Sequence, residues 1–267
     1  MTGAVRSADG TSIAFDAWGA GRPLVIVDGA TSHRAVNPLG AEIGQELADA
    51  FRVYAYDRRG RGESTDTQPY TIEREIEDIA ALIADGGGPA VVLGFSSGAV
   101  LAMDAVAAGL PVSHLALFEP PFVVDDVRPP LPVDYVEQLD RAVGEGRRDD
   151  AAALFMTAAA GMPPEAVEGM KQSPYWPPVV EVAHTIGYDG RIMGTTMSGH
   201  PLPTDRWAAI TAPTLVMYGE RTWPALLEGA KAAAEVLPTA KLLPVDGEQH
   251  SAPAHVLAPA LRAFVGA

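Results

Sequence analysis

Gly94-Phe95-Ser96-Ser97-Gly98 is the stretch of this sequence that decides the fold. An apolar run at 90–93 precedes it, and a helix-forming segment at 99–106 follows it. A Gly-x-Ser-x-Gly pentapeptide between a strand and a helix forms a sharp turn that exposes the serine hydroxyl. The two glycines are needed because a Cβ at either place would collide with the neighbouring strand or helix. We therefore interpret Ser96 as a nucleophile; the alternative is a plain tight turn.

Composition bounds the class of protein. The chain has 267 residues, of which 48% are hydrophobic, and this is enough to bury the core of one large α/β domain with an inserted subdomain. It contains no cysteine, which excludes disulfides, a thiol nucleophile and a thiolate metal site. The formal net charge of −15 argues against nucleic acid as a partner, because phosphate binding needs a basic face.

No segment of the chain has the pattern of an export signal or a membrane span. Residues 1–10 are polar and lack the basic-then-apolar pattern of a secretory signal. No apolar run approaches the roughly 18 residues that would indicate a membrane span. We therefore expect a cytoplasmic protein that has no membrane partner.

Apolar runs and amphipathic segments alternate along the chain, which is typical of a mostly parallel sheet with helices on both faces. The run at 24–27 is short and continuously apolar, as in a central parallel strand. The segment 71–84 places its isoleucines on one face of an amphipathic helix. The other predicted strands are 11–18, 51–56, 90–93, 112–118, 214–218 and 241–245, and the other predicted helices are 39–50, 99–106, 224–237 and 256–265.

The segment 121–205 interrupts this alternation. It is rich in proline, carries five of the eight methionines and reads as helices and loops. We predict that it is a helical cap inserted after the 112–118 strand. Residues 1–120 and 206–267 then form the α/β core.

Short motifs outside this segment resemble those of the α/β-hydrolases. Besides the pentapeptide they are Val27-Asp28-Gly29-Ala30, Tyr56-Asp57-Arg58-Arg59-Gly60-Arg61-Gly62-Glu63-Ser64, Leu117-Phe118-Glu119-Pro120-Pro121, Val216-Met217-Tyr218-Gly219 and Gly247-Glu248-Gln249-His250. The resemblance implies the α/β-hydrolase fold. It is much less specific for the substrate, because this fold hosts many reactions.

A serine hydroxyl is a weak nucleophile until a base removes its proton, so a histidine is needed. Of the six histidines, His250 lies just after the last predicted strand, where the family places its catalytic histidine. His255 falls at the start of the terminal helix, and His33 follows the first central strand and could line the pocket. No close cluster of His, Asp and Glu has metal-ligand spacing, and we expect neither a metal nor another cofactor.

The acid of the triad departs from the common family pattern. Most relatives carry an aspartate three residues after the glycine that ends the penultimate strand, but Thr222 occupies that place here. Either the triad is broken or its acid lies at another strand end. Glu119 directly follows the 112–118 strand, and a subset of α/β-hydrolases is similar in placing the acid there. We predict Glu119 as the acid, with Glu220 and Asp246 in reserve; the alternative is that Glu119 only caps the following turn.

The oxyanion of a tetrahedral intermediate needs two hydrogen-bond donors. The resemblance implies the backbone N–H of Ser97 and that of Ala30, with Gly29 allowing the close approach. Relatives usually have histidine before this glycine, whereas this chain has Asp28. Because its carboxylate would stand near developing negative charge, we expect Asp28 to point away from the site or to be paired.

The substrate is indicated only by local likenesses. The chain is similar to zearalenone-type lactone hydrolases in three short features: Asp28-Gly29, Ser96-Ser97-Gly98 and the acid Glu119. This resemblance implies a bulky, neutral, apolar ester or lactone as the small-molecule partner. Tyr175-Trp176-Pro177-Pro178 places aromatics on a stiff segment of the cap. We predict Trp176 and Phe122 as substrate-binding walls; the alternative is that they only bury the cap against the sheet.

The predicted activity is serine-dependent hydrolysis of a carboxylic ester or lactone through an acyl-enzyme. Two alternatives stay open. One is a non-hydrolytic enzyme of the same fold, such as an acyltransferase, a lyase or a biosynthetic cyclase. The other is a ligand-binding receptor with little turnover, which the threonine at position 222 favours slightly. A homodimer through the cap is compatible with the sequence, although no residue pattern supports it.

Overall fold

An eight-stranded sheet runs through the molecule in the order β1-β2-β4-β3-β5-β6-β7-β8. The structure is a computed structural model that describes all residues, 1–267. β1 and β2 pair antiparallel with their neighbours, and the other strands are parallel, so the predicted mostly parallel sheet is confirmed. The strands are β1 (Thr2–Arg6), β2 (Ser12–Trp18), β3 (Arg22–Val27), β4 (Phe51–Tyr56), β5 (Ala90–Phe95), β6 (Val112–Phe118), β7 (Thr214–Arg221) and β8 (Ala240–Glu248).

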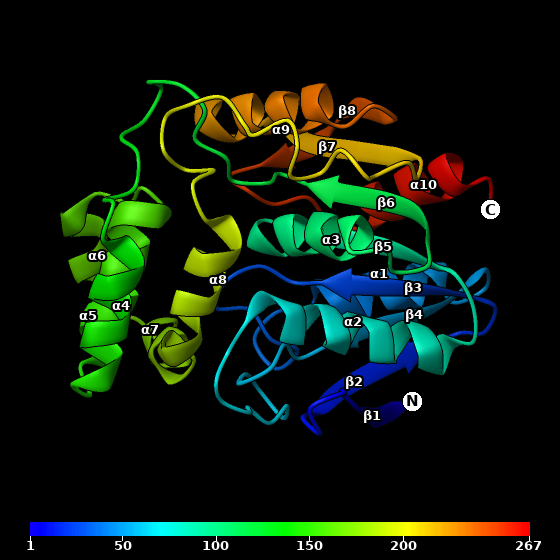
Figure 1. Cartoon of the computed structure of the whole chain (residues 1–267), viewed down its shortest axis with the longest axis horizontal. Helices are drawn as coiled ribbons and strands as arrows, with labels where there is room; N and C mark the ends of the chain where they lie inside the picture. The colour runs from blue at the N-terminus through cyan, green and yellow to red at the C-terminus, as the bar shows by residue number, and fades with distance from the viewer.

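Helices cover both faces of this sheet (Figure 1). α1 (Leu39–Leu47) and α10 (Ala254–Val265) pack on one face, and α2 (Ile72–Gly86), α3 (Ser97–Ala107) and α9 (Pro224–Val236) pack on the other. Successive side chains of a strand point to opposite faces. Leu24 and Ile26 of β3 therefore join the α1–α10 core, while Val25 and Val27 join the α2–α3–α9 core. This explains why that strand reads as a continuous apolar run.

A helical cap is inserted between β6 and β7 and lies beyond the ends of the parallel strands (Figure 1). Its helices are α4 (Tyr135–Gly144), α5 (Arg148–Leu154), the π-helix η1 (Phe155–Ala159), α6 (Pro164–Lys171), α7 (Trp176–Glu181), the 3₁₀ turn η2 (Ala183–Thr185) and α8 (Ile186–Met193). α8 packs directly on α3 of the core. The helical part of the predicted cap therefore spans 135–193, and its outer limits at 121 and 205 stay a prediction.

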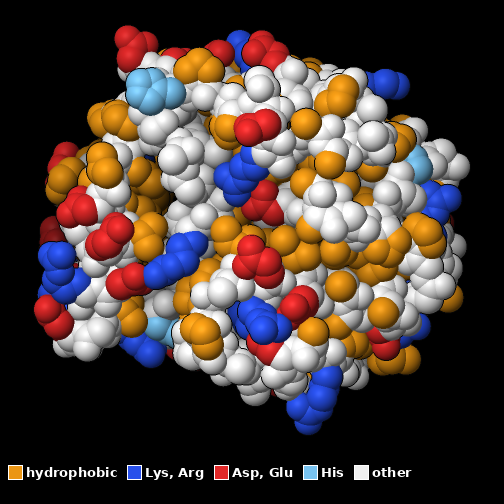
Figure 2. All heavy atoms as spheres, in the orientation of Figure 1, with side chains coloured by type: hydrophobic (Ala, Val, Ile, Leu, Met, Phe, Trp, Pro, Cys, Tyr) orange, Lys and Arg blue, Asp and Glu red, His pale blue; other side chains and the backbone are white.

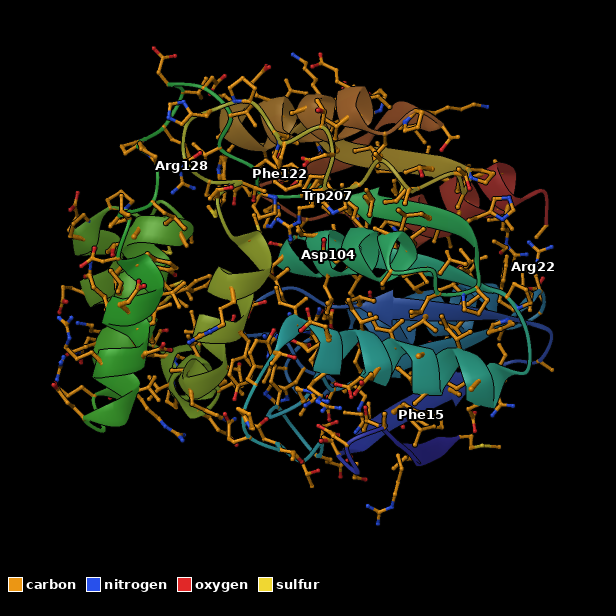
Figure 3. All side chains as sticks on the ribbon, viewed as in Figure 1. Phe15, Arg22, Asp104, Phe122, Arg128 and Trp207 are labelled. Atoms are coloured by element: carbon orange, nitrogen blue, oxygen red, sulfur yellow. The ribbon has the colours of Figure 1, made fainter.

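The segments that join the cap to the core are anchored to α3. Trp207 is buried and donates from Nε1 to Asp104 of α3 at 2.8 Å. The Phe122 ring, on the outgoing segment, lies 5.6 Å from the Trp207 ring (Figure 3). The outgoing and returning segments are thus held together above the same helix.

The surface of the cap carries exposed charges of both signs, which pair with one another (Figure 2). Arg147 pairs with Glu145, and Arg191 pairs with Asp140. None of the helices combines the length and the apolar content that a bilayer span requires.

Some element limits differ from those the sequence predicts. β1 was not predicted, because an edge strand with no fully buried residue leaves little apolar signal. β7 and β8 run several residues further than their apolar cores, since Arg221 still pairs with Glu248 beyond the buried part of the sheet. The ends of β7 and β8 are set by backbone hydrogen bonds between the two strands, which the apolar pattern of the sequence does not reveal.

Candidate active site

Ser96 lies at the turn between β5 and α3 with backbone angles φ 54° and ψ −128°. This left-handed conformation is costly for a residue with a side chain, and such strain is concentrated at functional sites. A Cβ on Gly94 would lie 2.5 Å from the Cα of Ala99, and one on Gly98 would lie 2.3 Å from the carbonyl oxygen of Val27. Both glycines of the pentapeptide are therefore required by close packing, as predicted.

Glu119 and His250 are in direct contact. Oε2 of Glu119 lies 2.6 Å from Nδ1 of His250, and Oε1 accepts a hydrogen bond of 2.8 Å from the N–H of Gly219. A carboxylate can only accept, so Nδ1 carries the hydrogen and Nε2 of the neutral ring is left as an acceptor. This is the arrangement in which an imidazole acts as a base.

The contact and its vicinity contain four residues other than glycine that have a positive φ. Besides Ser96 they are Glu119 at 46°, Gln249 at 48° and His250 at 64°. Each follows β5, β6 or β8, and β5, β6, β7 and β8 are neighbours in the sheet. Loops at the carboxyl ends of adjacent parallel strands meet at one edge of a sheet, where α/β proteins place their sites.

The structure brings the predicted triad together at one cavity. Ser96 and His250 both line a cavity of about 630 Å³ under the cap, and Glu119 is fully buried behind His250. The reserve acids are elsewhere: Glu220 is exposed, and Asp246 is exposed and pairs with Arg221.

The predicted oxyanion residues lie beside Ser96. Ala30 and Ser97 line the same cavity, and a Cβ on Gly29 would lie only 2.8 Å from the Cβ of Ser96. Nη1 of Arg61 donates to the carbonyl of Gly29 at 2.7 Å. In a trans peptide the carbonyl and the next N–H point in opposite directions, so this bond turns the N–H of Ala30 away from Arg61.

A buried ionic network under the site was not predicted from the sequence. Asp189 of α8 accepts hydrogen bonds from Nη1 of Arg58 and Nη2 of Arg61, both at 2.6 Å, and from the hydroxyl of Ser97 at 2.7 Å. Arg58 is also paired with Glu75. Burial opposes ionisation of Asp189, but the two guanidinium groups lower its pKa below the ordinary value. Asp189 is therefore a carboxylate of the cap that holds core residues on both sides of Ser96.

Asp28 is buried but does not line the cavity, and it is hydrogen-bonded rather than ion-paired. Its Oδ1 accepts a hydrogen bond of 3.3 Å from the side-chain amide of Asn37. Burial raises the pKa of Asp28 to about 6, although Ser32, Arg61 and Arg58 oppose this change. The carboxyl group therefore stays protonated to a higher pH than an exposed aspartate does.

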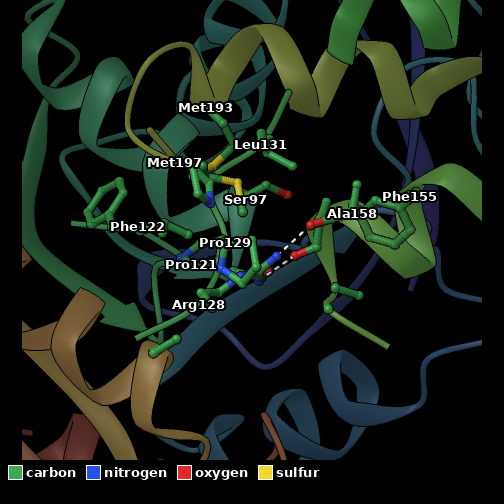
Figure 4. A pocket seen from close by; sticks show the side chains of 18 of the residues that line it. Ser97, Pro121, Phe122, Arg128, Pro129, Leu131, Phe155, Ala158, Met193 and Met197 are labelled. Atoms are coloured by element: carbon green, nitrogen blue, oxygen red, sulfur yellow. Dashed lines mark hydrogen bonds between the residues drawn. The ribbon is translucent and has the colours of Figure 1, made fainter. Parts of the chain in front are cut away.

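The cavity wall is mostly apolar, and Figure 4 shows Phe122, Met193 and Met197 among its lining residues. Phe122 lies on the wall, as predicted. The structure places Trp176 elsewhere: it packs inside the cap with Leu139 and Ile186, and its Nε1 donates to Asp149 at 2.9 Å. The sequence shows that an aromatic residue is in the cap but not which side of its helix faces the core. Trp223, which the sequence did not indicate, lines the cavity, and its ring lies 6.5 Å from that of His250.

The fold and the site define a class of α/β proteins with a serine at a sharp turn between a strand and a helix. The model of the alpha/beta hydrolase family matches residues 12–262, and the chain therefore belongs to the alpha/beta hydrolase family.

Individual relatives agree with this assignment. The chain is similar to the solved structure of an alpha/beta hydrolase from Sphaerobacter thermophilus DSM 20745, with 47% identity, a TM-score of 0.89 and coverage of 98% of this chain and 100% of that one. The enol-lactonase from Burkholderia xenovorans LB400 has the same fold at 21% identity, with a TM-score of 0.72 and full coverage of both chains, 100% and 100%. A match to proline iminopeptidase PfmaB of Pestalotiopsis fici is 40% identical but spans only 75 residues, 27% of each chain.

Proposed function

We propose that this chain is a serine hydrolase that cleaves a carboxylic ester or lactone of a bulky, apolar small molecule. The observation that carries the proposal is the 2.6 Å contact between Glu119 and Nδ1 of His250, at a cavity that Ser96 also lines. Membership of a hydrolase family supports it.

The proposed reaction has two halves. His250 takes the hydroxyl proton of Ser96 at Nε2 while the serine oxygen attacks the carbonyl carbon, and Glu119 stabilises the imidazolium that forms. The proton then passes from His250 to the leaving alkoxide, which leaves an acyl-enzyme. His250 next takes a proton from water as the hydroxide attacks the acyl carbon. The bond from that carbon to the Ser96 oxygen then breaks, the proton returns to this oxygen, and the acid is released.

The oxyanion of each tetrahedral intermediate would be held by the N–H groups of Ala30 and Ser97. Preorganised donors of this kind usually supply the largest single part of the acceleration. The bond from Arg61 to the carbonyl of Gly29 supports the orientation of the first donor. The second donor lies at the start of α3, where helix N–H groups have no partner within the helix.

Labelling and turnover test the proposal together. A fluorophosphonate probe should label the wild-type protein and not S96A, and a panel of 4-nitrophenyl esters should be hydrolysed only by the wild type. S113A, which alters a β6 hydroxyl outside the cavity, is the matched control and should keep both properties. Reaction in ¹⁸O-labelled water should place one labelled oxygen in the acid product. Saturable ligand binding without labelling would indicate a receptor, and a product without the label would indicate transfer or elimination.

A further inference from the structure

Arg128 differs from every other basic residue of the chain in its surroundings. Of the 19 lysines and arginines, all the buried and half-buried ones lie at ion-pair distance from a carboxylate, with Arg128 as the exception. It is partly buried on the segment that leads from β6 into the cap. A cation withdrawn from water without a counter-charge is costly, and natural proteins keep few of them.

The position of this charge is informative, because Arg128 lines the cavity that also contains Ser96 and His250. The other charged groups of the wall already have partners. Asp189 is paired with two arginines, and the ring of His250 is bonded to Glu119. Arg128 therefore gives a mostly apolar cavity one uncompensated positive charge.

Arg128 also has hydrogen-bonding capacity to spare. Nη1 donates to the carbonyl of Ala159 at 2.8 Å, and Nη2 donates to the carbonyl of Ala158 (Figure 4). These carbonyls belong to the π-helix η1, so the two bonds fix the guanidinium at the wall. A guanidinium has five N–H donors, which leaves three for a ligand. Burial lowers the pKa of Arg128, although this group remains charged at any ordinary pH.

We propose that Arg128 binds a carboxylate of the substrate, so that the chain acts on an ester or lactone whose apolar body bears one anionic group. This inference rests on the proposed function and replaces the expectation of a neutral substrate. A planar carboxylate matches the fork of a guanidinium, and the pairing gains strength in an apolar surrounding. The acyl carbon would lie at Ser96 and the carboxylate at Arg128, with the aliphatic part of the substrate on the apolar wall between them.

The test uses matched pairs of esters. The mono-4-nitrophenyl esters of the dicarboxylic acids from adipate to sebacate carry a free carboxylate, and the methyl ester of each is its neutral counterpart. We expect the wild type to prefer the acid over its methyl ester for the best chain length by about tenfold in kcat/KM, the scale of one charge-assisted hydrogen bond. In R128Q that preference should disappear, because activity on the acid falls more than activity on its methyl ester.

Control variants separate recognition from structure. R148Q removes another cap arginine that bonds a backbone carbonyl, Glu181, and that does not line the cavity, so it should keep the preference. R128K retains the charge but not the planar fork, and it should keep part of the preference for the acid. An equal loss on acid and methyl ester in R128Q would show that Arg128 only supports η1, and absence of a preference in the wild type would also overturn the proposal.

A binding measurement keeps this inference distinct from the proposed function. Suberic acid monomethyl ester should bind S96A about tenfold more tightly than it binds S96A/R128Q, measured by calorimetry without any turnover. If the wild type hydrolyses no ester but this difference is found, the proposed function fails and the carboxylate site stands. If esters are hydrolysed and the difference is absent, only the carboxylate site fails.

Discussion

The hydroxyl of Ser97 donates a hydrogen bond of 2.7 Å to the carboxylate of Asp189, which belongs to the cap helix α8. The other oxygen of this carboxylate accepts from Arg61, and Arg61 in turn donates to the carbonyl of Gly29. One carboxylate of the cap is therefore connected to both segments that supply the proposed oxyanion donors. The cap closes the cavity and also helps to fix the geometry of the core beneath it.

Removal of the Ser97 hydroxyl tests this connection. S97A keeps the backbone N–H but loses one buried hydrogen bond, worth about 1 kcal/mol, and Asp189 retains its two arginines. We expect kcat to fall about fivefold with little change in KM. The N–H of Ser97 is proposed to bond the oxyanion, which forms only as the reaction proceeds, so its displacement affects the transition state and not substrate binding. Steady-state kinetics on a neutral 4-nitrophenyl ester gives both constants. An unchanged kcat would show that α3 alone positions this N–H.

Asp189 itself should be essential for stability. D189N leaves Arg58 and Arg61 buried with too little negative charge, and breaking a buried pair in this way costs about 3 to 5 kcal/mol. We therefore expect a large loss in the free energy of urea unfolding. D140N, which breaks a pair with Arg191 on the cap surface, should lose less than about 1 kcal/mol. Similar losses in the two variants would show that the buried pairs of Asp189 contribute no more to stability than the exposed pair of Asp140.

The proposed acid can be tested against its exposed neighbour. In E119Q the carbonyl of the new amide can still accept from Gly219, but the amide N–H₂ then faces Nδ1 of His250. This favours the tautomer with the hydrogen on Nε2, which cannot accept the serine proton. We expect kcat to fall about a thousandfold or more, and E220Q to remain fully active. Full activity of E119Q with loss in E220Q would transfer the role to Glu220.

The oxyanion loop gives a steric prediction. In G29A the new Cβ would meet the Cβ of Ser96 at 2.8 Å and the carbonyl oxygen of Phe95 at 3.2 Å, so the loop must move. A displaced donor should reduce kcat by about a hundredfold. G169A, in α6, adds a Cβ with no neighbour within 4 Å and should leave kcat unchanged. If G29A matched G169A, the loop after β3 would not supply a donor.

The core of the site could be predicted because strand ends are visible in the sequence. Ser96, Glu119 and His250 each follow an apolar run, and parallel strands bring such positions to one edge of the sheet.

The sequence could not predict in the same way which residues of the cap face the core. Its short helices pack on one another as well as on the core, so an apolar residue such as Trp176 can face either side. Asp189 and Arg128 gave no signal, because a carboxylate in a helix and an arginine before two prolines are ordinary on a surface. Their roles follow from contacts with Ser97 and with the cavity, which only the folded chain brings about.

Asp28 gives a prediction of pH dependence. Its pKa rises from 3.8 to about 6 in the folded protein, mainly through burial. The folded state therefore binds more protons than the unfolded state between these values, and the stability contributed by Asp28 declines as the pH rises through that window. A change of this size corresponds to about 3 kcal/mol.

The variant D28N removes this titration while its carbonyl can still accept from Asn37. At pH 4 Asp28 is neutral in the folded state and only about half ionised in the unfolded state, so the variant and the wild type should differ by less than about 1 kcal/mol in their free energy of unfolding. At pH 8 the variant should be more stable by up to about 3 kcal/mol, since only the wild type then buries a charge. Urea unfolding of both proteins at pH 4, 6 and 8 measures the difference directly, and other titrating groups cancel in the comparison. A difference that stays constant from pH 4 to 8 would mean that Asp28 ionises normally, because Arg58 and Arg61 then compensate its burial in full.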